Sequence, residues 1–119
     1  MAEKKILIVD DNPNMASLLA EMLEVLDVPS KASTDGETAL RLLENEEFSL
    51  VITDLKMPNM SGVELLRAIK QKRHSLPVVV ISGFHLASHE GKVVDGLADG
   101  FINKPFKMTD IKSVLDQHL

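Results

Sequence analysis

The chain has 119 residues and a formal net charge of −5, and these two values already limit what it can be. The length suggests a single domain spanning residues 1–119, and 45% apolar residues are enough for one buried core. The absence of cysteine excludes disulfide bonds and thiolate metal sites. The acidic balance argues against a direct nucleic-acid-binding surface, which needs a basic face. Because the apolar runs are too short to cross a bilayer, we expect no membrane insertion and a cytoplasmic protein.

Strand and helix patterns alternate along the whole chain. Short runs of apolar, mostly β-branched residues indicate strands buried on both faces of a parallel sheet, and two weaker runs suit its edges. Between them, apolar residues spaced three and four apart indicate helices with one buried face. In chain order we expect strand 6–9, a helix from Pro13 that Pro29 stops, strand 31–33, helix 36–45, strand 50–52, a helix from Ser61, strand 78–81, helix 86–95, strand 101–102 and a helix from about Met108.

Local sequence signals support several of these helices. Asn12 supplies an N-cap before a proline at the first helical position, and Ser61 with Glu64 forms a capping box. Gly91 interrupts helix 86–95, which is therefore the weakest of the five. The apolar stripe of the first helix comprises Met15, Leu18, Leu19, Met22, Leu23 and Leu26.

The alternation predicts an α/β fold with a doubly wound five-stranded parallel sheet and five helices. Ligands of such sheets bind outside the carboxyl ends of the strands. Polar residues follow four of the predicted strands at that edge, namely Asp10 with Asp11, Asp54, Ser82 and Lys104. Each one alone is well explained as a turn or helix-start residue, but together on one edge they indicate a functional site.

The charges of these residues indicate the chemistry of the site. Three carboxylates face one ammonium, and like charges about 4 Å apart repel by roughly 4 kcal/mol at an effective dielectric constant near 20. Carboxylate oxygens without nearby histidine or cysteine favour a hard cation, and two or three acids favour Mg²⁺ over Ca²⁺. Lys104 and Ser82 can then hold phosphoryl oxygens, while an aspartate can act as a nucleophile and form an aspartyl-phosphate.

Four segments of the chain resemble the receiver domain of two-component response regulators, and the likeness covers nearly the whole chain. They are residues 6–11, 54–62, 80–83 and 101–106. Each segment is modestly specific, but all four in this order and at family spacing are very specific. The resemblance implies a flavodoxin-like fold with strand order 2-1-3-4-5.

The resemblance also implies a role for each residue of the predicted site. It makes Asp54 the phosphoacceptor, Lys104 the family lysine and Ser82 the family hydroxyl residue. Phe101 stands at the position of the switch aromatic, which turns inward after Ser82 moves toward the phosphoryl group. For the metal, the resemblance implies Mg²⁺ bound by the carboxylates of Asp11 and Asp54, by Asp10 mainly through water, and by the main-chain carbonyl of Lys56.

The implied function is a phosphorylation-activated signalling switch. A sensor histidine kinase or a phosphotransfer protein presents a phosphohistidine, the acceptor aspartate takes its phosphoryl group with Mg²⁺ bound, and water later removes it. Phosphorylation alters the face made by the fourth helix, fifth strand and fifth helix, to which a downstream effector responds. Such a domain catalyses only its own phosphorylation and dephosphorylation, so it is not a conventional enzyme. We expect a monomer or a weak dimer.

Two other functions fit part of the pattern. A phosphorylation-independent interaction module with a receiver fold usually lacks some of the acids, the hydroxyl or the lysine, all of which this chain has. An aspartyl-phosphate phosphatase of the haloacid dehalogenase type needs a second aspartate two residues after Asp54, where this chain has Lys56. His85 and His89 share the spacing of paired metal ligands on a helix, but we interpret them as surface histidines. The chain has no P-loop and no dinucleotide-binding glycine motif.

Overall fold

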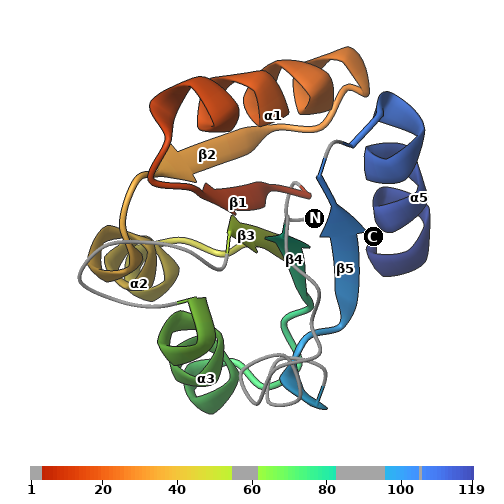
Figure 1. Ribbon diagram of the computed structural model, residues 1–119. Coiled ribbons are helices and arrows are strands. Elements are labelled where there is room, and N and C mark those ends of the chain that lie inside the picture. Colours follow the sequence, from red (N-terminus) through yellow and green to blue (C-terminus); the bar gives the residue numbers. More distant parts are fainter. Residues whose placement is uncertain (1–3, 55–61, 83–95, 105) are drawn as a thin grey trace.

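The computed structural model describes residues 4–54, 62–82, 96–104 and 106–119 (Figure 1). All five predicted strands and four of the predicted helices are present, and the helix predicted for residues 86–95 lies outside the described residues. In chain order the elements are β1 (Ile6–Val9), α1 (Pro13–Val25), β2 (Ser30–Ser33), α2 (Gly36–Asn45), β3 (Leu50–Asp54), α3 (Gly62–Lys72), β4 (Val78–Ser82), β5 (Gly100–Asn103) and α5 (Met108–His118).

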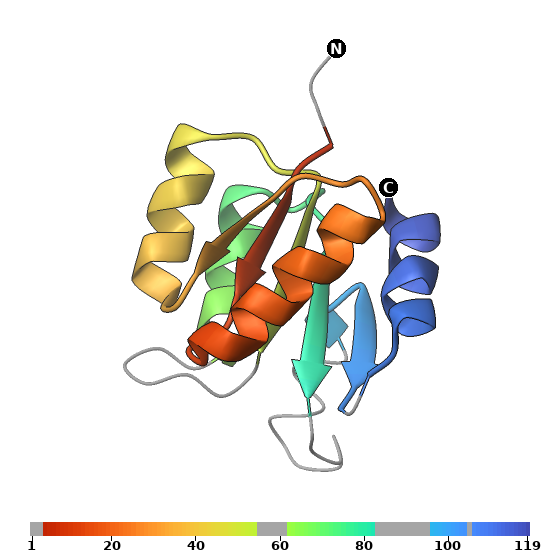
Figure 2. The same ribbon diagram turned by 90° about the horizontal axis from the view of Figure 1, so that it is seen from above.

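The strands form one parallel sheet in the order β2-β1-β3-β4-β5, which confirms the order implied by the family resemblance. Helices α1 and α5 cover one face of this sheet, and α2 and α3 cover the other (Figure 1). Figure 2 shows the strand arrows pointing the same way, so their carboxyl ends meet at a single edge. The doubly wound arrangement therefore brings together the residues directly after each strand.

Side chains along each strand alternate between two buried clusters, as the twofold repeat of a strand requires. Leu7 and Val9 pack with residues of α2 and α3, whereas Ile6 and Ile8 pack with residues of α1 and α5. Since both faces of the sheet are covered, the central strands favour apolar residues on both faces. This double burial explains why the predicted strands are continuous apolar runs and not alternating ones. Among the described residues, no helix has the length and apolar character needed to cross a membrane.

Helix α1 ends before it reaches Pro29, so the prediction that the proline stops it was wrong. Asp27 adopts the left-handed conformation, with φ of 63°. The N–H of Val28 donates to the carbonyl of Leu23 at 2.9 Å, and the N–H of Asp27 donates to the carbonyl of Glu24 at 3.0 Å. These two bonds form a Schellman motif, which satisfies the last carbonyls of the helix. The local hydrogen bonds end α1, and the proline only comes after them.

One residue of the predicted apolar stripe of α1 does not pack into the core. The buried residues of the helix are Ala16, Leu19 and Leu23, whereas the exposed fraction of Leu18 is 45%. A residue two positions along a helix is rotated by roughly 200°, so Leu18 points away from the face on which Ala16 lies. The buried face is therefore narrower than the sequence pattern predicts.

Candidate functional site

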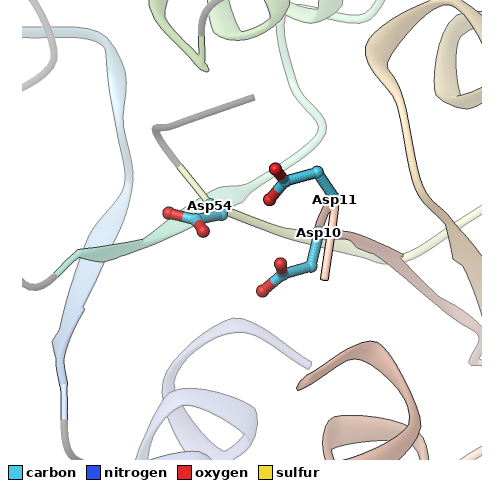
Figure 3. A group of neighbouring side chains, drawn as sticks. All are labelled: Asp10, Asp11 and Asp54. Carbon is cyan, nitrogen blue, oxygen red and sulfur yellow. The ribbon is translucent and has the colours of Figure 1, made fainter. Parts of the chain in front are cut away.

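Three aspartates come together at the carboxyl edge of the sheet. Asp10 and Asp11 directly follow β1, and Asp54 is the last residue of the neighbouring strand β3. Because the two strands are parallel and adjacent, with Val9 paired to Thr53, their ends deliver these side chains to one place. One carboxylate oxygen from each aspartate lies within 4.8 Å of the other two (Figure 3).

Asp10 is the most buried of the three, with an exposed fraction of 1%. Its Oδ1 accepts a hydrogen bond from the N–H of Asn12 at 2.9 Å, while its Oδ2 is buried without a hydrogen-bond partner among the described residues. Burial raises the pKa of Asp10, and the charges of Asp54 and Asp11 raise it further, against the lowering effect of Asn12 and Lys104. A buried oxygen of this kind is costly unless a cation or a proton reaches it.

Lys104 brings a positive charge to the site. It follows β5, and its Nζ donates to Oδ2 of Asp54 at 3.2 Å. The side chains of the two residues are 29% and 12% exposed, respectively. Among the described residues of this edge, one ammonium faces three carboxylates, which leaves a formal charge of −2 when all are ionised.

The residues at this edge fit a hard divalent cation on three grounds. The donors are carboxylate oxygens, which Mg²⁺ prefers. The formal charge of −2 matches that of the ion. The buried Oδ2 of Asp10 has no hydrogen-bond partner among the described residues, and a cation bound there can take that place. Asp11 is exposed, so solvent reaches the cluster.

Other predicted site residues are placed only in part. Ser82 is the last residue of β4. The preceding residue, Ile81, is paired with Asp54, so the backbone of Ser82 lies at the same edge of the sheet. Its side chain lies outside what the structure describes, as does the whole of Lys56. Phe101 lies in β5, and its side chain is 36% exposed. The histidine pair at 85 and 89 also lies outside the described residues.

Sequence reasoning missed one polar residue next to the acceptor candidate. Thr53 is fully buried in β3, and its hydroxyl donates to the main-chain carbonyl of Asp54 at 3.0 Å. The only sequence signal is a hydroxyl residue within an otherwise apolar strand, directly before the aspartate. That signal is weak because threonine is common in strands.

Comparison with known proteins identifies the family. The family model of the response regulator receiver domain matches residues 6–116 of the chain. The chain belongs to this family. The receiver domain is 31% identical over 116 residues to the chemotaxis protein CheY of Pseudomonas aeruginosa, covering 95% of this chain and 94% of that protein. It is 34% identical over 110 residues to the sensor histidine kinase RcsC of Escherichia coli K12, covering 92% of this chain but only 12% of RcsC.

Solved structures share the fold of this receiver domain. The response regulator TrrA of Thermotoga maritima, solved in complex with Mg²⁺ and BeF, superposes with a TM-score of 0.88 at 30% identity, covering 98% of this chain and 99% of that one. The chemotaxis protein CheY4 of Vibrio cholerae superposes with a TM-score of 0.91, covering 99% of this chain and 100% of that one. At 23% identity, CheY4 shows the likeness of the fold alone.

Proposed function

We propose that this receiver domain of two-component signalling is a phosphorylation-activated switch in which Asp54 accepts the phosphoryl group. The observation that carries the proposal is the meeting of three carboxylates with the ammonium of Lys104 at one sheet edge. A set of charges that repel one another is expensive to fold, so its presence favours a role in binding.

The carboxylates of Asp10, Asp11 and Asp54 are the proposed ligands of Mg²⁺, together with the main-chain carbonyl of Lys56. The orphaned Oδ2 of Asp10 and the formal charge of −2 support this assignment. Bound Mg²⁺ supplies positive charge that offsets the charge of the incoming phosphoryl oxygens. The relative TrrA, which was solved with Mg²⁺ and BeF, gives the proposal further support.

In the proposed reaction, a carboxylate oxygen of Asp54 attacks the phosphorus of a phosphohistidine. The new P–O bond forms as the P–N bond breaks, and its electron pair returns to the imidazole ring of the donor. The ammonium of Lys104 binds one phosphoryl oxygen, and the hydroxyl of Ser82 donates to another. Water later attacks the phosphorus, and the Asp54 carboxylate leaves. The domain thus turns over only its own phosphoryl group and is not a conventional enzyme.

The proposed donor is a sensor histidine kinase or a phosphotransfer protein, which the likeness to RcsC and CheY supports. We propose that residues 1–119 act as a single cytoplasmic receiver domain, monomeric or weakly dimeric, without direct contact to nucleic acid. The proposed output surface includes β5 and α5, where the side chain of Phe101 is partly exposed. Its effector recognises the change of this surface on phosphorylation.

Intact-mass spectrometry after incubation with acetyl phosphate and Mg²⁺ tests the proposal. The wild-type domain is expected to gain one phosphoryl group, about 80 Da. Asp54→Asn keeps the size of the side chain and should gain nothing, while the exposed control Asp116→Asn should label like wild type. Equal labelling of Asp54→Asn would show that another residue is the acceptor. An unlabelled wild type would instead favour a phosphorylation-independent interaction module.

A further inference from the structure

Thr53 places a hydroxyl in a part of the sheet that is otherwise apolar. Its partners in register are Val9 on β1 and Val80 on β4, and all three side chains are at most 1% exposed. Burying a hydroxyl costs free energy unless it makes a hydrogen bond, and valine has nearly the same shape without that cost. Packing alone therefore does not explain a threonine at this position.

The hydroxyl of Thr53 acts on the residue that carries the proposed chemistry. It donates to the main-chain carbonyl of Asp54 at 3.0 Å. Since strand side chains alternate, Thr53 faces the cluster that contains Val51, on the side of α2 and α3. The side chain of Asp54, the next residue along the strand, leaves from the opposite face, and one of its carboxylate oxygens lies within 4.8 Å of an oxygen of Asp10 and of Asp11 (Figure 3). The backbone of Asp54 is thus held from the side of the sheet opposite its carboxylate.

Asp54 lies where the sheet loses one of its two neighbouring strands. The pairing of β3 with β1 ends at Thr53, whereas the pairing with β4 continues to Asp54. The hydrogen bond from Thr53 supplies an additional anchor at this residue. An anchor matters here because the charges of Asp10 and Asp11 repel the Asp54 carboxylate.

We infer that Thr53 is a positioning residue for phosphoryl transfer, holding the backbone of Asp54 so that its carboxylate stays aligned with its partners. The inference rests on the proposed role of Asp54 as phosphoacceptor. Thr53 itself does not touch the reacting group, because its side chain faces the other side of the sheet. Small losses of alignment slow a displacement reaction strongly, since the attacking atom must approach in line.

Two substitutions separate positioning from packing. Thr53→Val keeps the shape of the side chain and removes the hydroxyl. We expect its thermal stability to equal or exceed that of wild type. Its phosphorylation rate should be about fivefold lower, the change that the loss of one hydrogen bond worth about 1 kcal/mol produces. Thr53→Ser keeps the hydroxyl and removes a buried methyl group. It should phosphorylate at close to the wild-type rate while its melting temperature falls by about 5 °C. A residue with only a structural role would give the opposite order of rates.

Both rates are measured by intact mass with acetyl phosphate at saturating Mg²⁺, and Mg²⁺ affinity is measured by titration calorimetry. The affinity is expected to fall in Thr53→Val and to stay unchanged in Thr53→Ser. A wild-type phosphorylation rate in Thr53→Val, or an equal slowing in both variants, overturns the positioning role. If wild type is not phosphorylated at all, the proposed function fails, and Mg²⁺ affinity alone then decides the role of Thr53. Unchanged affinity in Thr53→Val rejects that role as well.

Discussion

The Nζ atom of Lys104 lies 3.2 Å from Oδ2 of Asp54, although 50 positions separate the two residues in the sequence. They belong to the ends of β5 and β3, between which β4 lies, so the lysine side chain extends past the end of β4. The ammonium neutralises part of the acidic cluster. As a cation beside the same carboxylate, it also competes with any metal ion that Asp54 binds.

Replacing this lysine should therefore separate metal binding from phosphorylation. In Lys104→Met, which keeps the length and removes the charge, Mg²⁺ affinity should rise roughly three- to tenfold because a like-charge repulsion of about 1 kcal/mol is gone. Phosphorylation by acetyl phosphate should fall by at least about tenfold, since the transferred group loses its ammonium partner. Titration calorimetry and intact mass measure the two effects, with the exposed Lys107→Met as control. Weaker Mg²⁺ binding by Lys104→Met would contradict this account.

Asp10 is buried beside two other carboxylates, so we expect its charge, which the proposed function needs, to lower the free energy of unfolding. Asp10→Asn removes a buried charge beside two carboxylates and keeps an acceptor for the N–H of Asn12. In EDTA its free energy of unfolding should rise by about 1–2 kcal/mol, whereas Mg²⁺ should stabilise it far less than wild type. Urea unfolding with EDTA and with Mg²⁺ tests both effects. Asp11→Asn is the matched control, and its free energy of unfolding in EDTA should rise by less because Asp11 is exposed. A loss of stability in Asp10→Asn under EDTA would count against the repulsion described here.

The end of α1 offers a stabilising substitution far from the site. Asp27 has a φ of 63°, a conformation that glycine adopts without steric cost. Asp27→Gly should therefore raise the free energy of unfolding by about 0.5–1 kcal/mol. Glu24→Gly, within the helix, is the control and should lower it by about 1 kcal/mol. Chemical denaturation measures both free energies of unfolding. An equal decrease in the two variants would show that the left-handed conformation of Asp27 does not cost stability.

Asp99 lies at the edge of the sheet where β4 and β5 begin, opposite the acidic cluster, and we expect its contribution to the free energy of unfolding to depend on pH. Its Oδ2 accepts hydrogen bonds from the N–H of Val78 at 2.8 Å and from Nζ of Lys70 at 2.5 Å. Burial raises the pKa of Asp99, but these two bonds and the charges of Lys70 and His118 together outweigh burial, so the pKa lies below the ordinary value of 3.8. A lowered pKa gives stability that is present above the unfolded-state pKa and is lost as the pH falls through the folded-state pKa.

Asp99→Asn keeps an acceptor for Val78 and removes the charge that pairs with Lys70. At pH 7 it should be about 1 kcal/mol less stable than wild type, a modest value because the aspartate is partly exposed to solvent. The difference should shrink as the pH falls below about 4. Urea unfolding between pH 3 and pH 7 measures it, with the exposed Asp116→Asn as control. A difference independent of pH would exclude the ionised pair as its source.

Phe101 gives a test of the proposed output surface. Its side chain is 36% exposed, and we expect it to turn inward when the phosphoryl site is filled. In a sample labelled with fluorophenylalanine, the signal of Phe101, assigned with Phe101→Leu, should shift and become protected from a soluble paramagnetic agent when beryllofluoride is added. The buried Phe48, 6% exposed, is the internal control. A Phe101 signal that stays unchanged would exclude this route to the output surface.

The sheet and its acidic edge could be predicted because they depend on patterns that the chain carries locally. Runs such as Ile6–Val9 are apolar at every position only if both faces are covered, and parallel strands place the residues after their carboxyl ends at one edge. Asp10, Asp11 and Asp54 could therefore be brought together from the sequence alone. The strand order came from the family resemblance, since periodicity carries no information on which strands are neighbours.

The features that escaped prediction depend on backbone conformation and on tertiary contacts. Asp27 ends α1 in a conformation that is usually signalled by glycine, so the proline two residues later was the stronger sequence signal. The bond from Thr53 to the next carbonyl has only a weak signal in the sequence, a hydroxyl residue directly before the aspartate. Which carboxylate pairs with Lys104 depends on side-chain geometry across three strands.

The order of the charges along the chain also has a consequence during synthesis. A ribosome makes Asp10, Asp11 and Asp54 before Lys104, whose codon comes 50 positions after that of Asp54. At usual translation speeds this interval lasts roughly 2.5–10 s. Strands β1 to β4, with all three aspartates, are therefore made before the ammonium of Lys104. Until β5 is made, cations from the solvent can offset the charge at this edge, so we expect nascent-chain folding to be sensitive to divalent ions.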